Sequence, residues 1–303
     1  MAGVITTGNH PRALWPGIQD WFGREYGKHA PEWSQVFDEV KGTKNYEEDA
    51  EVTGFGLAQV KTEGSAISYD SETQGITPRY TQKVYGLGYI VTREELEDNL
   101  YEKVSKRRAE ALAFSVNQTV ENVHALILDR SSNDSYTMTG GDGVGLLSTA
   151  HPTVDGTQSN ELATAADLSE ASLEDICVQI MNATNSRGHQ ISLRPQCVLV
   201  PPNEYFNASR ILESELQNDT ANNAKNIIKG MFPQGLKVNH YVTDTDAWWV
   251  KTSVPSGLKS IWRRKIEFKT DGDFDTENAK AKATVRFVPG WTDFRVLFGS
   301  LGS

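Results

Sequence analysis

The sequence predicts an α+β protein, and three patterns in it favour that fold class. Thr92 and Glu95 have the spacing of a helix capping box, and the segment after them runs to about Asp129 without Pro or Gly, which is typical of one long helix. Residues 85–91 alternate large apolar and small side chains, as a half-buried strand does. Residues 168–262 mix helix-periodic segments with short apolar strands, which indicates a compact α/β module.

Composition narrows the class of protein further. The chain has 303 residues and a formal net charge of -10, so it is long enough for a large core and too acidic for tight, sequence-independent binding to nucleic acid. Cys177 and Cys197 lie in apolar stretches and are expected to be free, buried thiols. The sequence shows no signal peptide and no run of roughly 18 apolar residues that could span a membrane. We therefore expect a protein made and used in a cytoplasm.

The first 50 residues form an aromatic-rich arm. Apolar side chains recur there at helical spacing, at Leu14, Ile18, Trp21, Phe22 and Tyr26. An arm of this composition has to bury itself, either against its own body or against a neighbouring molecule.

Residues 55–91 predict a long two-stranded hairpin around a polar tip. Its first arm runs from about Leu57 to Tyr69, and its return arm places Tyr85, Leu87, Tyr89 and Val91 on one face, with Gly86 and Gly88 on the other. Glycines on one face suit the close approach of another backbone. Such a hairpin is marginal by itself in water, so we expect it to find a partner outside the subunit.

The α/β module predicts alternating helices and strands. We expect a helix capped near Ser172, a strand at 197–200 and a second helix that starts at Asn203. The segments 236–243 and 247–251 are expected to pair across the turn between them. A second long hairpin, of residues 264–270 and 281–288, then closes the chain, followed by the apolar segment 294–298.

No motif in the sequence has the full set of residues that a catalytic, nucleotide-binding or metal-binding site requires. The glycine-rich segment 140–145 lacks the Lys-Ser/Thr ending of a phosphate loop, and the acidic run of Asp271, Asp273 and Asp275 lacks the Gly and Glu of a calcium loop. His151 is a conceivable general base, but the sequence has no nucleophile elbow to serve it. We therefore expect no catalytic residue, no metal site and no cofactor. The arm, the hairpin and the long helix each carry surface that a monomer would bury poorly, which indicates extensive assembly.

The order of these elements resembles the tailed-phage major capsid proteins of the Hong Kong 97 fold. Residues 85–96 resemble the entry from E-loop to spine helix in the Mu-like head-subunit branch of that family. Residues 273–298 resemble its closing P-domain strands, and Val198, Pro201–Pro202 and Tyr205–Phe206 resemble its A-domain core. The resemblance implies five segments: an N-terminal arm (1–50), an E-loop (51–91), a P-domain with the spine helix (92–167), an A-domain (168–262) and P-domain return strands (263–303).

The same resemblance implies a structural role. The subunit would assemble with itself as hexamers and pentamers into an icosahedral head, with a separate scaffolding protein, a portal, a decoration protein and packaged double-stranded DNA that it does not bind sequence-specifically. It would be located in the virion, after assembly in the host bacterial cytoplasm. The E-loop and N-terminal arm would supply the contacts between subunits, through Trp15, Trp21, Phe22, Tyr69, Asp70, Glu72, Ile76, Arg79, Tyr85, Leu87 and Tyr89.

Two alternatives stay open at this point. A bacterial encapsulin shell shares the fold and would differ by holding cargo enzymes in place of a genome. A cytosolic α/β hydrolase or binding protein would use the 168–262 module, as a monomer with a ligand pocket near His151.

Overall fold

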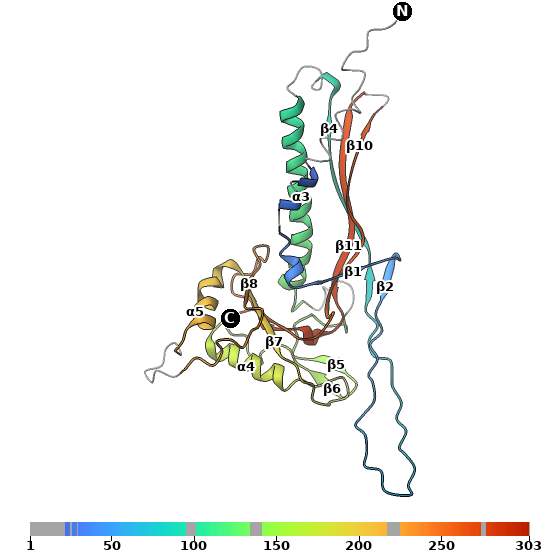
Figure 1. Ribbon diagram of the computed structural model, residues 1–303, viewed down its shortest axis with the longest axis vertical. Coiled ribbons are helices and arrows are strands. Elements are labelled where there is room, and N and C mark those ends of the chain that lie inside the picture. Colours follow the sequence, from blue (N-terminus) through green and yellow to red (C-terminus); the bar gives the residue numbers. More distant parts are fainter. Residues whose placement is uncertain are drawn as a thin grey trace, which may run out of the picture.

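The computed structural model describes residues 22–24, 26–28, 30–94, 101–133, 141–216, 225–273 and 277–302, with the side chains of α3 described from Lys106 onward. The subunit is elongated (Figure 1). One long helix and a sheet of long strands form a shaft, and a compact α/β module lies at one end of it. A long loop projects from that same end, away from the shaft.

The sheet of the shaft has four strands in the order β1-β10-β11-β4. The long hairpin of β10 (Leu258–Gly272) and β11 (Ala279–Trp291) forms its centre, so the predicted closing hairpin is confirmed and extends further at both ends. β1 (Asp38–Lys41) pairs in parallel with β10, and β4 (Lys83–Val91) pairs antiparallel with β11.

Helix α3 (Tyr101–Asp129) packs on one face of this sheet. Its buried stripe, which includes Ala113, Val116 and Val120, meets Val285 and Phe287 of β11. Burying such a stripe, rather than helix propensity alone, stabilises a helix of this kind. The predicted long helix is confirmed over the bounds of α3. Its predicted capping box involves Glu95, which lies outside the described residues, although Arg93 and Glu94 are helical.

The module holds a second four-stranded sheet, in the order β12-β9-β7-β8. Its strands are β7 (Pro195–Val200), β8 (Leu236–Val238), β9 (Trp248–Thr252) and β12 (Leu297–Ser300). The predicted pairing of 236–243 with 247–251 is wrong, because β7 lies between β8 and β9 and pairs with both. Because β9 pairs with β7 on one side and with β12 on the other, it has no edge left on which to pair with β8.

The module's helices cover the outer face of its sheet. These are α4 (Glu170–Met181) and α5 (Tyr205–Glu213), and α5 follows a turn of 3-10 helix at Pro202–Glu204. The capping box of α4 is formed by Ser169 and Ser172, so the N-cap lies three residues earlier than predicted. A small hairpin of β5 (His151–Thr153) and β6 (Gly156–Gln158) precedes α4, and a 3-10 turn at Phe294–Val296 precedes β12.

Two neighbouring tryptophans show how the two halves share a core. Trp249 faces the shaft and packs in one cluster with Leu128 of α3 and Phe294, whereas Trp248 faces α4 and α5 and packs with Ile176 and Ile211. Both indoles are fully buried. The alternation of side chains along β9 therefore joins the shaft to one face of the module's sheet and the helices to the other.

The predicted unsupported hairpin is wrong in its return arm. β4 is an edge strand of the shaft sheet, and its glycines are crowded by their own subunit: a Cβ at Gly88 would lie 2.7 Å from the carbonyl oxygen of Ala281. A Cβ at Gly86 would lie 3.2 Å from the methyl group of Thr284. These glycines therefore fit close packing against β11 and not the approach of a second subunit.

Candidate assembly surface

The projecting loop leaves the body through a short antiparallel ribbon of β2 (Tyr46–Glu48) and β3 (Arg79–Thr81). Backbone-to-backbone hydrogen bonds continue between its arms as far as Thr53, whose N–H donates to the Thr73 carbonyl at 3.1 Å. Residues 57–69 then form no strand, so the predicted first strand from Leu57 to Tyr69 is wrong. Among the described residues, no strand lies beside this segment to pair with it.

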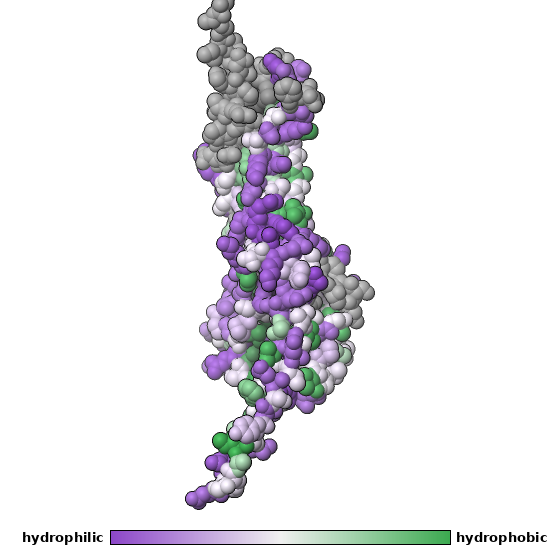
Figure 2. All heavy atoms as spheres, turned by 90° about the vertical axis from the view of Figure 1, so that its right-hand side faces the viewer, coloured by the Kyte–Doolittle hydropathy of each residue, from purple (hydrophilic) through white to green (hydrophobic). Residues whose placement is uncertain are grey.

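The loop exposes large apolar side chains to solvent. Val60 and Tyr69 are each 95% exposed. The others that are more than half exposed are Val52, Phe55, Leu57 and Ile67. Figure 2 shows the loop reaching out from the body, with hydrophobic patches among hydrophilic residues. Covering one such side chain contributes about 1.5–3 kcal/mol, so this surface favours association with another molecule.

Asp70 connects the two arms of the loop near the outer end of the part in which they contact each other. Its Oδ2 accepts the N–H of Gly56 at 2.7 Å and a hydrogen bond from Nη1 of Arg187 at 2.6 Å. The Gly56 N–H, and after it the Arg187 guanidinium, hold the pKa of Asp70 below its usual range. The carboxylate is therefore ionised at neutral pH, as an ion pair with Arg187 requires.

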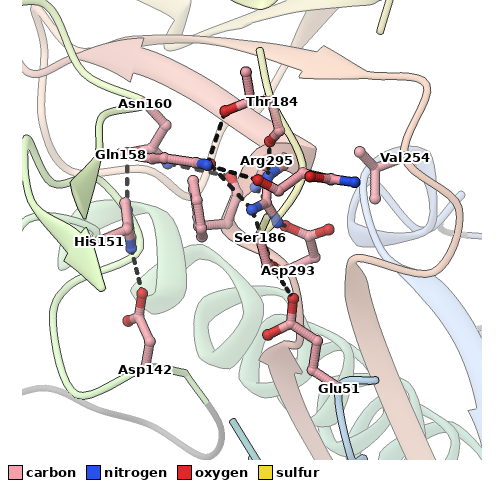
Figure 3. Close-up of polar contacts among 12 residues, drawn as sticks. Glu51, Asp142, His151, Gln158, Asn160, Thr184, Ser186, Val254, Asp293 and Arg295 are labelled. Atoms are coloured by element: carbon pink, nitrogen blue, oxygen red, sulfur yellow. Dashed lines mark hydrogen bonds and ion pairs between the residues drawn. The ribbon is translucent and has the colours of Figure 1, made fainter. Parts of the chain in front are cut away.

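The base of the loop is joined to the module by a polar network around Arg295 (Figure 3). Ser186 Oγ donates a hydrogen bond to the Glu51 carboxylate, and Nη2 of Arg295 lies 3.3 Å from the same hydroxyl. Arg295 also donates to the Thr184 carbonyl at 2.8 Å and to Gln158 Oε1 at 3.0 Å. Only 5% of Arg295 is exposed, and a buried guanidinium requires partners of this kind.

His151 belongs to the same region and is fully buried. Its Nδ1 lies 2.6 Å from Asp142 Oδ2 and its Nε2 lies 3.0 Å from Asn160 Oδ1, while the ring stacks on Phe294. The Asn160 amide nitrogen donates to three backbone carbonyls, including that of Leu146, which fixes its orientation. Both ring nitrogens are thus engaged in holding the loop 141–160, and neither is available to a substrate.

A pocket of about 340 Å³ adjoins this network, between α4 and the 3-10 turn before β12. Its lining includes Gln158, Gln179, Thr184 and Arg295, and the polar groups of Gln158 and Arg295 bind one another. Among the residues that the structure describes, no group of His, Cys, Asp and Glu is placed to hold a metal ion, and no helix is long and apolar enough to cross a membrane.

Three residues of the predicted contact set lie against the subunit's own core. Phe22 is buried and stacks on Phe268 of its own chain at 4.9 Å, and Tyr85 and Tyr89 pack against the subunit's own core. All three residues therefore contribute to the packing of the shaft within the subunit. Trp15 and Trp21 lie outside the described residues.

The other predicted residues lie on or near the loop. Tyr69, Asp70, Glu72 and Arg79 are exposed, Ile76 is half-buried at the loop base, and Leu87 is 51% exposed on the edge strand β4. Sequence analysis missed Arg187, Ser186 and Arg295, because no local motif marks them and only the fold brings them to the loop.

The N-terminal segment 30–37 docks on α3 through a buried carboxylate. Glu121 accepts the backbone N–H groups of Glu32 at 2.9 Å and Trp33 at 3.0 Å. Burial raises the pKa of Glu121 to about 7, against the lowering effect of those two hydrogen bonds. Glu32 in turn accepts from His240 Nδ1 at 2.8 Å, so the arm, the shaft and the module meet at this point.

Comparisons with known proteins agree with this architecture. A family model described as "Phage capsid protein" matches residues 75–298. No curated protein matches the chain. In the solved structures, the fold is similar to that of Mycobacterium phage Patience (10% identity, 99% of this chain and 92% of that chain covered, TM-score 0.56) and Mycobacterium phage Adephagia (12% identity, 91% of each chain covered, TM-score 0.56). It is also similar to a virus-like particle from Pyrococcus furiosus (11% identity, 94% and 98% covered, TM-score 0.52).

The phage capsid family match, on a chain with a long shaft, a compact module and an exposed apolar loop, identifies a structural protein and not an enzyme. The chain belongs to the phage capsid protein family, since the family match covers well over half of it. It is a structural major capsid protein of the phage head, with a mixed α and β fold. The family match therefore favours a capsid protein over the alternative of a cytosolic hydrolase or ligand-binding protein.

Proposed function

We propose that this subunit has the Hong Kong 97 fold and assembles as hexamers and pentamers into an icosahedral head around double-stranded DNA. The observation that carries the proposal is the projecting loop, whose large apolar side chains are left exposed by the part of the chain that the structure describes. In this arrangement the loop reaches over a neighbouring subunit, and the module, residues 168–262, lies around the local symmetry axes.

We keep the predicted boundaries of the arm (1–50) and of the P-domain with α3 (92–167) as part of the proposal. The return strands (263–303) are kept as well, except that β12 at their end pairs with β9 and belongs to the sheet of the module. The E-loop is better bounded at 51–78, because β4 pairs with β11 of the body and Tyr80 of β3 is fully buried.

The partners follow from the same proposal. The head would require a separate scaffolding protein and a portal, could carry a decoration protein, and would form in the host bacterial cytoplasm. The formal net charge of -10 suits a wall that does not bind the packaged DNA tightly, since like charges repel.

Electron microscopy of the purified chain, produced with and without its scaffolding protein, tests the proposal. Closed shells or ring-shaped oligomers of at least hexamer size support it, and a monomer whose mass by light scattering is independent of concentration contradicts it. Shells isolated from infected cells should contain nuclease-protected DNA. Shells filled with an enzyme cargo in place of DNA would instead identify an encapsulin-like compartment.

A further inference from the structure

The turn Asn185–His189, between α4 and β7, is held in one conformation by its own hydrogen bonds. The Asn185 N–H donates to the His189 carbonyl at 2.8 Å, and the Asn185 side-chain oxygen accepts the N–H groups of Arg187 and His189, each at 2.9 Å. Gly188 has a φ of 77°, and a Cβ there would lie 1.9 Å from Asp155 Oδ2. The turn is therefore formed by the module itself and does not depend on the loop that it contacts.

This turn contacts both arms of the projecting loop. On the first arm, Ser186 Oγ donates to the Glu51 carboxylate. On the second arm, the Arg187 guanidinium donates through Nη1 to Asp70 Oδ2 and through Nη2 to the Ser71 carbonyl. Two acceptors at one place match the fixed fork of an arginine, which a lysine ammonium cannot reproduce.

The position of these contacts along the loop matters. Gly56 and Asp70 mark the outer end of the connected part, and the exposed apolar segment 57–69 begins directly beyond them. A loop joined to the body only by the ribbon of β2 and β3 could pivot there, since a two-stranded ribbon is marginal by itself. A second attachment, at Arg187, removes that freedom.

We propose that Arg187 is a positioning residue, which clamps the second arm of the loop, and through Asp70 the first arm, to the turn Asn185–His189. The clamp thereby sets the direction in which residues 57–69 are presented to a second copy of this chain. This proposal rests on the proposed function of the loop as a contact between subunits. The clamp itself is a property of the single subunit, so it can be tested separately from assembly.

Hydrogen–deuterium exchange on the full-length, unassembled chain tests the clamp. Arg187→Ala should accelerate exchange at residues 51–56 and 71–76 at least fivefold and leave the melting temperature within about 2 °C of wild type, because an exposed ion pair contributes little to global stability. Arg187→Lys should give intermediate protection. Arg194→Ala, which removes an exposed arginine from the same segment, is the matched control and should change nothing. Unchanged exchange in Arg187→Ala would overturn the clamp.

A double-variant comparison then tests the role in assembly. Arg187→Ala should slow shell formation at least fivefold relative to wild type. If the clamp acts through Asp70, adding Asp70→Ala to Arg187→Ala should slow shell formation no further. Wild-type assembly rates in Arg187→Ala, with faster loop exchange, would overturn the positioning role. If the wild-type chain forms no shells at all, the proposed function fails, while the exchange result still decides the clamp.

Discussion

The imidazole of His124, on α3, stacks on the ring of Phe287, on β11, with centroids 5.3 Å apart and planes 6° apart. Trp33 of the N-terminal segment stacks on the same imidazole at 4.7 Å. The ring's Nδ1 lies 2.7 Å from the Val120 carbonyl and must donate to it, so Nε2 accepts from Ser260 Oγ at 2.7 Å. One neutral histidine therefore joins the arm, the helix and the sheet of the shaft.

Burial lowers the pKa of His124 to about 3, and this predicts a loss of stability in acid. The unfolded chain binds the proton near its ordinary pKa of about 6.5, so the stabilisation is present above that pH and is lost as pH falls toward the folded pKa. Between pH 7 and 5.5 we expect the free energy of unfolding to drop by about 1 kcal/mol on account of this group. Urea unfolding of wild type and His124→Phe over this range measures it. A variant with the same pH slope as wild type would contradict the assignment.

Glu121 predicts the opposite dependence on pH. Its folded pKa is raised to about 7, so its stabilising contribution is present below the ordinary pKa of a glutamate and is lost as pH rises through the folded value. From pH 6 to 8 wild type should lose about 1 kcal/mol more than Glu121→Gln, which cannot ionise. The variant itself is expected to be less stable, because the amide nitrogen cannot accept the Trp33 N–H. Unfolding curves of both proteins at pH 6 and at pH 8 measure this difference. Equal losses of unfolding free energy in wild type and Glu121→Gln would refute the prediction.

Gly88 and Gly86 offer a matched pair for the packing of the edge strand. A Cβ at Gly88 meets a backbone carbonyl at 2.7 Å, whereas at Gly86 it meets the Thr284 methyl at 3.2 Å, which can shift by a few tenths of an ångström. We expect Gly88→Ala to destabilise the subunit by about 1–3 kcal/mol and Gly86→Ala by less than 1 kcal/mol. Thermal melting of both variants measures the difference. Equal effects would show that β4 can move away from β11.

How much of this could be predicted from the sequence depends on the range of the interactions. The hairpin of β10 and β11 was predictable, because its alternating side chains and its turn lie within one continuous segment. The pairing of β8 with β9 was predicted wrongly, because Val198–Val200, almost forty residues earlier, supply a strand that separates them. Local pattern favours neighbours in sequence, and a buried apolar strand with two partners overrides that preference.

The same limit applies to the assembly surface. Tyr69 was placed on the hairpin and in the predicted contact set, and the structure leaves it 95% exposed. Tyr85 and Tyr89 have the same apolar character, yet they face their own core, since the pattern of a strand shows which residues share a face and not what covers it. Arg187 had no distinguishing pattern at all: its partner, Asp70, is 117 residues away.

The apolar segment of the loop, residues 57–69, should be needed for assembly and dispensable for folding. It forms no strand and adds no residue to the buried core, so its removal costs the subunit little. We predict that a short Gly-Ser turn joining Gly56 to Asp70 leaves a subunit that melts cooperatively within about 3 °C of wild type, while normal shells no longer form. The join should stop there, because Pro78 and Tyr80 further along are buried and a larger deletion would damage the body.

Thermal melting and negative-stain imaging of the same samples measure both halves of this prediction. Val60→Ser combined with Tyr69→Ser is the milder counterpart, since it keeps the loop's length and removes its two most exposed apolar side chains. It should weaken assembly without changing the melting temperature. A replacement that fails to fold would place this segment in the subunit's own structure. Normal shells from the variant with the Gly-Ser turn would show that subunits associate through another surface, because segment 57–69 would then not be required. Normal shells from the double serine variant would show that Val60 and Tyr69 are not the side chains that make the contact.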